Sequence, residues 1–164
     1  MTEGKKFKVA GYVKLAKLWE KRRKEALQYQ NCYYSEKYRD LSQFQLVEVF
    51  VDITGEKRIA KRKEMLRLIK QCMDGNVDCI AAQTKAYLSA DTREFCYLIK
   101  LLSEINYGIE LVTEDSDYHI DTIINTENQK EALREMAEKY IALNPTDYDK
   151  WHQKIVEAIE KDVK

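Results

Sequence analysis

Residues 7–17, with the sequence FKVAGYVKLAK, constrain the fold more than any other stretch of the chain. Their side chains alternate between the two faces of a strand: Phe7, Val9, Gly11 and Val13 point to one face, and Lys8, Ala10, Tyr12 and Lys14 to the other. A helical stretch is expected to follow from about residue 18 to residue 38. In an open α/β sheet a site lies at the carboxyl ends of the strands, so residues 14–17 are where chemistry is expected.

The same order of strand and helix continues along the chain. Short apolar runs predict strands at residues 44–52, 77–82 and 109–113, and amphipathic patterns predict helices at 61–74 and 91–106. A long helix is expected at 126–144, ended by Pro145, and Thr146 or Asp147 would cap a last, short helix. The pattern predicts an α/β fold, in which a mostly parallel, four- to five-stranded sheet is flanked by helices and followed by a long helix and a short C-terminal helix.

Length and composition indicate a globular chain. It has 164 residues, of which 45% are hydrophobic, and only five glycines and one proline. We expect an α/β domain at residues 1–125 and a helical extension at 126–164, with no separate DNA-binding domain. No apolar run approaches the roughly 18 residues of a membrane helix, and no secretory pattern is present, so a cytoplasmic protein is expected.

The net charge is zero, but the charge is unevenly distributed. Residues 1–70 hold 18 Lys/Arg and 9 Asp/Glu, a net charge of +9. Residues 71–164 hold 10 Lys/Arg and 19 Asp/Glu, a net charge of −9. Such polarity can bind phosphates at one end or pair a molecule with its neighbour, and solvated faces that differ in charge would also give it. The four cysteines lack C-x-x-C spacing and there are two histidines, so no metal or cofactor is predicted and the cysteines are expected to be reduced and buried.

Several short phrases occur in the order and at the separations of a known family. They are GYVKLAK at 11–17, LQYQ at 27–30, VEVFVD at 47–52 followed by Arg62, MDGNVDCI at 73–80, AYLSAD at 86–91 and IELVTE at 109–114. With them the chain, from about residue 9 to residue 114, resembles the catalytic domain of the serine recombinases, the resolvase/invertase family. The helix expected from Thr126 is more loosely similar to the dimerisation helix of that family.

The resemblance implies a site that has lost its chemistry. In this family a serine hydroxyl attacks a DNA phosphodiester, arginines stabilise the developing charge, and no metal takes part. The positions that differ from the family pattern are Lys14, Ala16, Ala86, Tyr87 and Ala90, and those that match it are Gln30, Asp52 and Arg62. Ala16 stands at the serine position and has no oxygen to attack with, while Lys14 keeps the charge of an arginine without its bidentate fork.

Other polar residues have structural interpretations. Ser89 is expected to help start the helix at Asp91, and Glu94, three residues further on, predicts a capping box. The first helix carries a row of tyrosines, for which an edge of the core or of a subunit interface is favoured over stacking on single-stranded bases: Tyr29, Tyr33, Tyr34 and Tyr38.

The sequence therefore predicts a catalytically inactive, serine-recombinase-like domain that serves as an oligomerisation or regulatory module. Its partner would be a second copy or an active recombinase, with no membrane and no small-molecule substrate. The alternative is a module that binds DNA without sequence preference through its basic N-terminal half, with Lys14, Lys17 and Arg62 as candidate contacts. A surface salt bridge is the competing interpretation of Arg62. An active enzyme of another kind lacks support, because neither Ser35 nor Thr84 has an adjacent histidine or clustered arginines.

Overall fold

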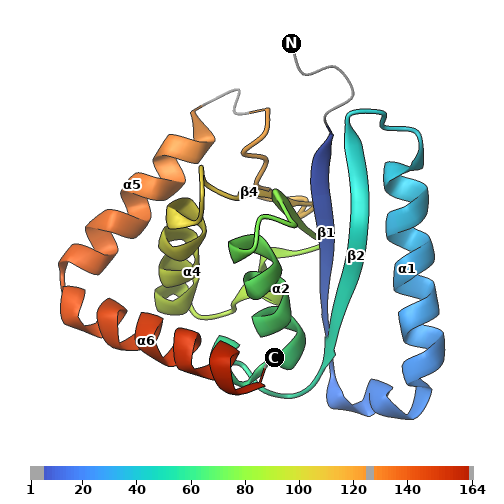
Figure 1. Cartoon of the computed structure of the whole chain (residues 1–164), viewed down its shortest axis with the longest axis horizontal. Helices are drawn as coiled ribbons and strands as arrows, with labels where there is room; N and C mark the ends of the chain where they lie inside the picture. Colours follow the sequence, from blue (N-terminus) through green and yellow to red (C-terminus); the bar gives the residue numbers. More distant parts are fainter. Residues whose placement is uncertain (1–5, 125–127, 163–164) are drawn as a thin grey trace.

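A parallel sheet of four strands forms the centre of the molecule (Figure 1). The structure is a computed structural model and describes residues 6–124 and 128–162. The strands are β1 (Phe7–Leu15), β2 (Phe44–Ile53), β3 (Cys79–Ala82) and β4 (Glu110–Thr113), in the spatial order β2-β1-β3-β4. Every pairing between them is parallel. The predicted α/β fold class and the positions of all four strands are confirmed.

Helices connect the strands and continue after the last one. They are α1 (Arg23–Arg39), α2 (Lys63–Met73), α3 (Lys85–Leu88), α4 (Thr92–Glu104), α5 (Gln129–Ala142) and α6 (Pro145–Asp162), with short 3-10 helices η1 (Lys17–Arg22) and η2 (Ile59–Lys61). The helix expected from about residue 18 begins as η1, in which Leu18 is exposed. The predicted start of α5 at Thr126 lies outside the described residues.

The last helix differs from its prediction in start and length. It runs for 18 residues and begins at Pro145, not after a cap at Thr146 or Asp147. Proline suits the first helical position because its missing N–H would have no intrahelical partner there. Gly75 directly follows the C-cap residue of α2 and has a φ of 79°, a conformation that glycine adopts without steric cost. Helix α4 ends at Glu104 with Ile105 as its C-cap, so Gly108, with a φ of 96°, lies beyond the end of that helix.

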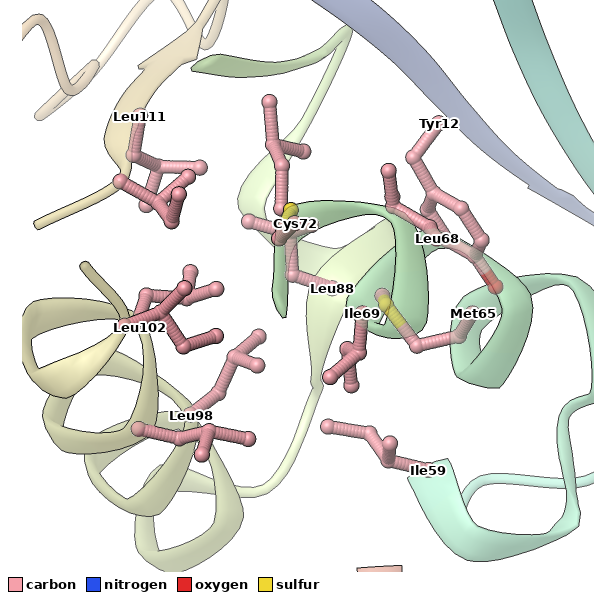
Figure 2. Packing of buried hydrophobic residues seen from close by; sticks show 14 of the residues in the cluster. Tyr12, Ile59, Met65, Leu68, Ile69, Cys72, Leu88, Leu98, Leu102 and Leu111 are labelled. Carbon is pink, nitrogen blue, oxygen red and sulfur yellow. The ribbon is translucent and has the colours of Figure 1, made fainter. Parts of the chain in front are cut away.

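Strand β1 contributes to hydrophobic cores on both faces of the sheet, as its alternation predicts. Ala10 and Tyr12 belong to the core that contains α2 and α4, shown in Figure 2, and Val9 and Val13 belong to the core that contains α1. A Cβ atom at Gly11 would lie 3.0 Å from the ring of Tyr34, so only glycine lets α1 approach the strand this closely. Burial of each large apolar side chain contributes about 1.5–3 kcal/mol, and these two cores hold the sheet between its helices.

The two C-terminal helices pack on the same body. Ala137 of α5 and Ile155 and Ile159 of α6 belong to the core that contains α2 and α4. In Figure 1 α6 runs beneath α4 and α2, and it contacts α2, α4, α5 and η2. The expected domain boundary at residues 125 and 126 lies outside the described residues. No helix in the described ranges is long and apolar enough to cross a membrane.

The cysteines are free, and three of the four are buried as predicted. Cys72, Cys79 and Cys96 lie in the cores, whereas Cys32 is exposed on α1. Burial raises the pKa of all three core thiols, which keeps them protonated and unreactive at neutral pH. The prediction of an apolar setting was wrong for Cys32 because α1 turns this position toward solvent.

Candidate functional site

The carboxyl ends of β1 and β2 meet at one edge of the sheet, where chemistry is expected. Leu15 pairs in register with Ile53, and Ala16 follows directly in an extended conformation (φ −62°, ψ 151°). Ala16 is exposed, and its carbonyl accepts a hydrogen bond from the N–H of Trp19 at 3.0 Å as η1 begins. The position therefore presents a methyl group to solvent, which can neither attack a phosphorus atom nor carry a proton.

Lys14 and Lys17 lie on either side of Ala16 and differ in their surroundings. The ammonium of Lys14 is half-buried and donates to the carbonyl oxygen of Thr54 at 3.3 Å. Burial lowers the pKa of Lys14, and the nearby charge of Arg62 lowers it further. Lys17 is exposed as the first residue of η1. Both amines are placed at the edge of the sheet, but only Lys17 is fully in solvent.

Asp52 of β2 is buried and pairs in register with Lys14 of β1. Its side chain caps the N-terminus of α2, although Asp52 is not part of that helix. Its carboxylate accepts hydrogen bonds from the backbone N–H groups of Glu64 and Met65 at 2.9 Å, in the first turn of α2. It also accepts a hydrogen bond from the hydroxyl of Tyr12 at 2.7 Å. These bonds satisfy amides that the helix itself cannot pair, and the negative charge suits the positive end of the helix dipole. The geometry assigns Asp52 a structural role.

Arg62 is buried, with 1% of its surface exposed. Its guanidinium donates to the carbonyl oxygens of Tyr87 at 2.7 Å and Leu88 at 2.5 Å, and to the hydroxyl of Tyr12 at 3.1 Å. Both surface interpretations of Arg62, the salt bridge and the phosphate contact, were wrong about its position. The carbonyls at the end of α3 draw the side chain inward, because they would otherwise lack a donor.

The remaining positions of the family pattern are spread over two elements. Gln30 lies in the buried row of α1, and its Oε1 has no hydrogen-bond partner among the described atoms. In residues 86–90, Ala86 and Ala90 are exposed and Tyr87 is half-buried. None of these three side chains carries a charge, so the segment offers a phosphate no cation. The backbone carbonyl of Tyr87 still joins it to Arg62.

The N-terminus of α4 is built partly as predicted. The hydroxyl of Ser89 accepts the N–H of Asp91 at 3.2 Å, and the carboxylate of Asp91 accepts the N–H of Arg93 at 2.8 Å. The predicted capping box is absent, because Glu94 turns away from Asp91. Its carboxylate accepts the N–H of Ile59 at 3.2 Å and the indole N–H of a tryptophan in α6 at 2.8 Å.

Sequence reasoning missed the role of Glu94 and of its partner Trp151. Glu94 joins three elements that lie far apart in the sequence: η2, α4 and α6. No local pattern signals this, since spacing alone favours the capping box. In the described ranges, no three His, Cys, Asp or Glu side chains are grouped so that they could hold a metal ion.

Solved structures of serine recombinase catalytic domains resemble this fold. The N-terminal catalytic domain of TP901-1 integrase superposes with a TM-score of 0.56 at 17% identity, and the match covers 87% of this chain and 97% of that one. A resolvase family site-specific recombinase from Streptococcus pneumoniae gives 0.54 at 17% identity, covering 93% and 99%. The C-terminal catalytic domain of ISC1926 TnpA, an IS607-like serine recombinase, gives 0.52 at 20% identity, covering 93% and 94%.

No family model matches the chain, and no curated protein matches it in sequence. The likeness is therefore one of fold, at identities of 17–20%. The chain has the fold of a serine recombinase catalytic domain, as its sequence phrases predict. At the carboxyl end of β1, the first strand of this fold, stands Ala16.

Proposed function

We propose that this protein is a catalytically inactive relative of the serine recombinases that acts as an oligomerisation or regulatory module. Ala16 is the observation that carries the proposal: within the recombinase fold, the residue after the first strand has a methyl group in place of a nucleophile. A fold can persist after its site is lost, because function depends on the site rather than on the fold.

The cationic groups near Ala16 also fit the loss of chemistry. Lys14 donates to a backbone carbonyl, and Arg62 is buried among carbonyls and a phenol. Removal of a single group that stabilises the transition state typically lowers a rate by about 10²–10³. With Ala16 in place of the serine, and with uncharged side chains at Ala86, Tyr87 and Ala90, no covalent route to DNA cleavage is left.

Helix α5 offers a surface for assembly. Met136 and Tyr140 are 42% and 38% exposed, and Leu143, directly after the helix, is 83% exposed. Their spacing of four and three residues places them in one row, and an exposed apolar row on a helix fits a partner helix. We infer that the partner is a second copy of this chain or an active recombinase. A mixed assembly would lack one or more nucleophiles and be blocked in strand cleavage.

Sedimentation velocity over a range of concentrations tests this role. The proposal predicts a dimer or larger assembly that the double substitution Met136→Lys with Tyr140→Lys converts to monomer, because two charges would enter the interface. Glu135→Lys with Glu138→Lys, on exposed positions of the same helix, is the matched control and should leave the assembly intact. A wild-type protein that stays monomeric, alone and when mixed with an active serine recombinase, would contradict the proposal.

A second function, DNA binding without sequence preference, is favoured by the charge near the carboxyl edge of the sheet. Lys17, Lys57 and Lys61 are exposed there, and Lys57 is close enough to Lys14 to lower its pKa further, after burial and Arg62. Such a cluster can meet phosphates through charge alone. The candidate contacts in this role are Lys14 and Lys17, since Arg62 is buried.

Titration of labelled random-sequence duplex DNA at two salt concentrations tests the second function. Micromolar affinity that falls steeply with salt would support it, and the double substitution Lys17→Gln with Lys57→Gln should then lower the slope of log K against log salt by about 1.8. Absence of binding at low salt would leave assembly as the surviving function.

A further inference from the structure

A groove of ≈ 900 Å³ lies between α6 and the segments that carry η2 and the first turns of α2 and α4. Basic side chains line it from both sides. On α6 they are Lys150, Lys154 and Lys161, whose spacing of four and seven residues places them on one face of the helix. Across the groove they are Arg58, Lys61, Lys63 and Arg93. The net charge of −9 over residues 71–164 does not reveal this basic row, because acidic residues are interspersed with it along α6.

The basic side chains are largely free to meet a ligand. Apart from Arg58, which lies 3.7 Å from Glu56, none of them forms an ion pair in the part of the chain that the structure describes. Five acidic side chains also line the groove, but four of them accept hydrogen bonds within the protein: Asp91, Glu94, Asp147 and Glu157. The fifth is Asp162. These hydrogen bonds come from uncharged donors and do not cancel the charges of the carboxylates, so the seven basic and five acidic side chains give the lining a formal net charge of +2.

Two aromatic rings line the groove together with the basic residues. The centroids of Tyr97 and Trp151 are 5.5 Å apart, and Trp151 is half-buried. The indole N–H of Trp151 is bonded to Glu94, which holds the ring in one orientation. A fixed aromatic ring between rows of cations is the arrangement that binds single strands, since phosphates meet the cations and bases stack on the ring.

We propose that this groove binds single-stranded nucleic acid, with its phosphates between the two basic walls and a base stacked on Trp151. A duplex is the poorer fit, because its bases are stacked on one another and offer no free face to the indole. The site goes beyond the assembly role of α5 proposed above and does not depend on it. It shares Lys61 with the basic cluster considered above for duplex DNA, but Lys14, Lys17 and Lys57 do not line the groove.

Fluorescence anisotropy with a labelled oligothymidylate tests the charge contacts. Lys154→Gln removes one phosphate contact, so the slope of log K against log salt should fall by about 0.7, the value for one phosphate on a single strand. Lys139→Gln on α5 makes the same change at an exposed position outside the groove and should leave the slope unchanged. Equal slopes for wild type and Lys154→Gln, or absence of binding at low salt, would overturn the proposal.

Tryptophan fluorescence tests the stacking contact separately. The sequence has two tryptophans, so in a Trp19→Phe background the emission comes from Trp151 alone. Oligothymidylate should quench this emission, and the matching duplex should bind more weakly and quench less. Binding without quenching would overturn the proposal, as would equal affinity for the duplex. Displacement of the oligonucleotide by polyglutamate at an equal concentration of charges would instead identify an acidic polypeptide as the ligand.

Discussion

Tyr12, Asp52 and Arg62 form a buried hydrogen-bonded chain that joins four elements of the fold. The hydroxyl of Tyr12 donates to Asp52 at 2.7 Å and accepts from Arg62 at 3.1 Å, and Arg62 continues to the carbonyls at the end of α3. Burial in the core raises the pKa of Tyr12, which keeps the phenol protonated as a donor. At the scale of single residues, these three polar groups connect β1, β2, α2 and α3.

Replacement of Arg62 should destabilise the protein. Arg62→Met keeps much of the volume but leaves the carbonyls of Tyr87 and Leu88 without donors, at an expected cost of roughly 3 kcal/mol in the free energy of unfolding. Urea denaturation measures this loss. Arg58→Met, at an exposed position nearby, is the matched control and should stay within about 0.5 kcal/mol of wild type. Equal stability of the two variants would show that the buried bonds of Arg62 contribute little.

Residues with local roles could be predicted from the sequence, and residues with distant partners could not. Ser89 and Asp91 act on amides two residues away, and their predicted roles at the start of α4 are confirmed. The predicted surface position of Arg62 was wrong because the partners of its side chain lie 25 and 26 residues further along the chain. Local spacing carries no information about such contacts.

At the scale of elements, α6 is attached to the body of the protein through Glu94. This carboxylate accepts from Ile59 in η2 and from Trp151 in α6, so one side chain fixes the loop after β2 and the last helix together. The ring of Trp151 also packs against Tyr97 and Tyr148, with centroids 5.5 and 5.9 Å away. The walls of the basic groove therefore depend on a buried polar contact between them.

Loss of the Glu94 carboxylate should loosen both of the elements that it holds. Glu94→Ala leaves the N–H groups of Ile59 and Trp151 without acceptors, which should cost roughly 3 kcal/mol. Hydrogen exchange should quicken in η2 and α6 more than in α1, which lies on the opposite face of the sheet. Glu135→Ala, at an exposed position of α5, is the control and should change neither. Uniform acceleration over the whole chain would contradict this local role.

The strands and most of the helices could be predicted because their signals are periodic. Alternation in β1 and the apolar run of β3 give the correct strands, and β3 lies between β1 and β4 as a strand buried on both faces. Tyr34 and Tyr38 lie in the core as favoured, whereas Tyr29 is exposed. The capping box failed because two competing donors, one from η2 and one from α6, bind the same carboxylate.

At the scale of the whole molecule, buried phenols link stability to alkaline pH. Burial is the first cause that raises the pKa of Tyr12, Tyr34, Tyr38 and Tyr148, and burial with the contact to Glu114 raises that of Tyr33 to about 12. A phenol whose pKa is raised by folding contributes its full stability below the unfolded pKa of about 10. That contribution is lost as the pH rises from there toward the folded pKa.

The free energy of unfolding should therefore fall steeply above about pH 10. Each buried phenol contributes about 1.4 kcal/mol per pH unit to this slope, so Tyr34→Phe should make the slope shallower by about that amount. Urea denaturation between pH 9 and 11, with tyrosinate absorbance recorded in parallel, measures both effects. Ionisation of the core tyrosines in a protein that remains folded would contradict the burial described here.

The central proposal is that this protein, with Ala16 after the first strand of a recombinase fold, does not form a covalent bond to DNA. The most direct measurement is to incubate the protein with fragmented duplex DNA, denature the mixture, and look for protein attached to DNA by mass spectrometry. An active serine recombinase with its own site serves as the positive control. The account predicts an adduct in the control and none with this protein. A phosphoester-linked adduct of the wild-type protein at any residue would contradict it.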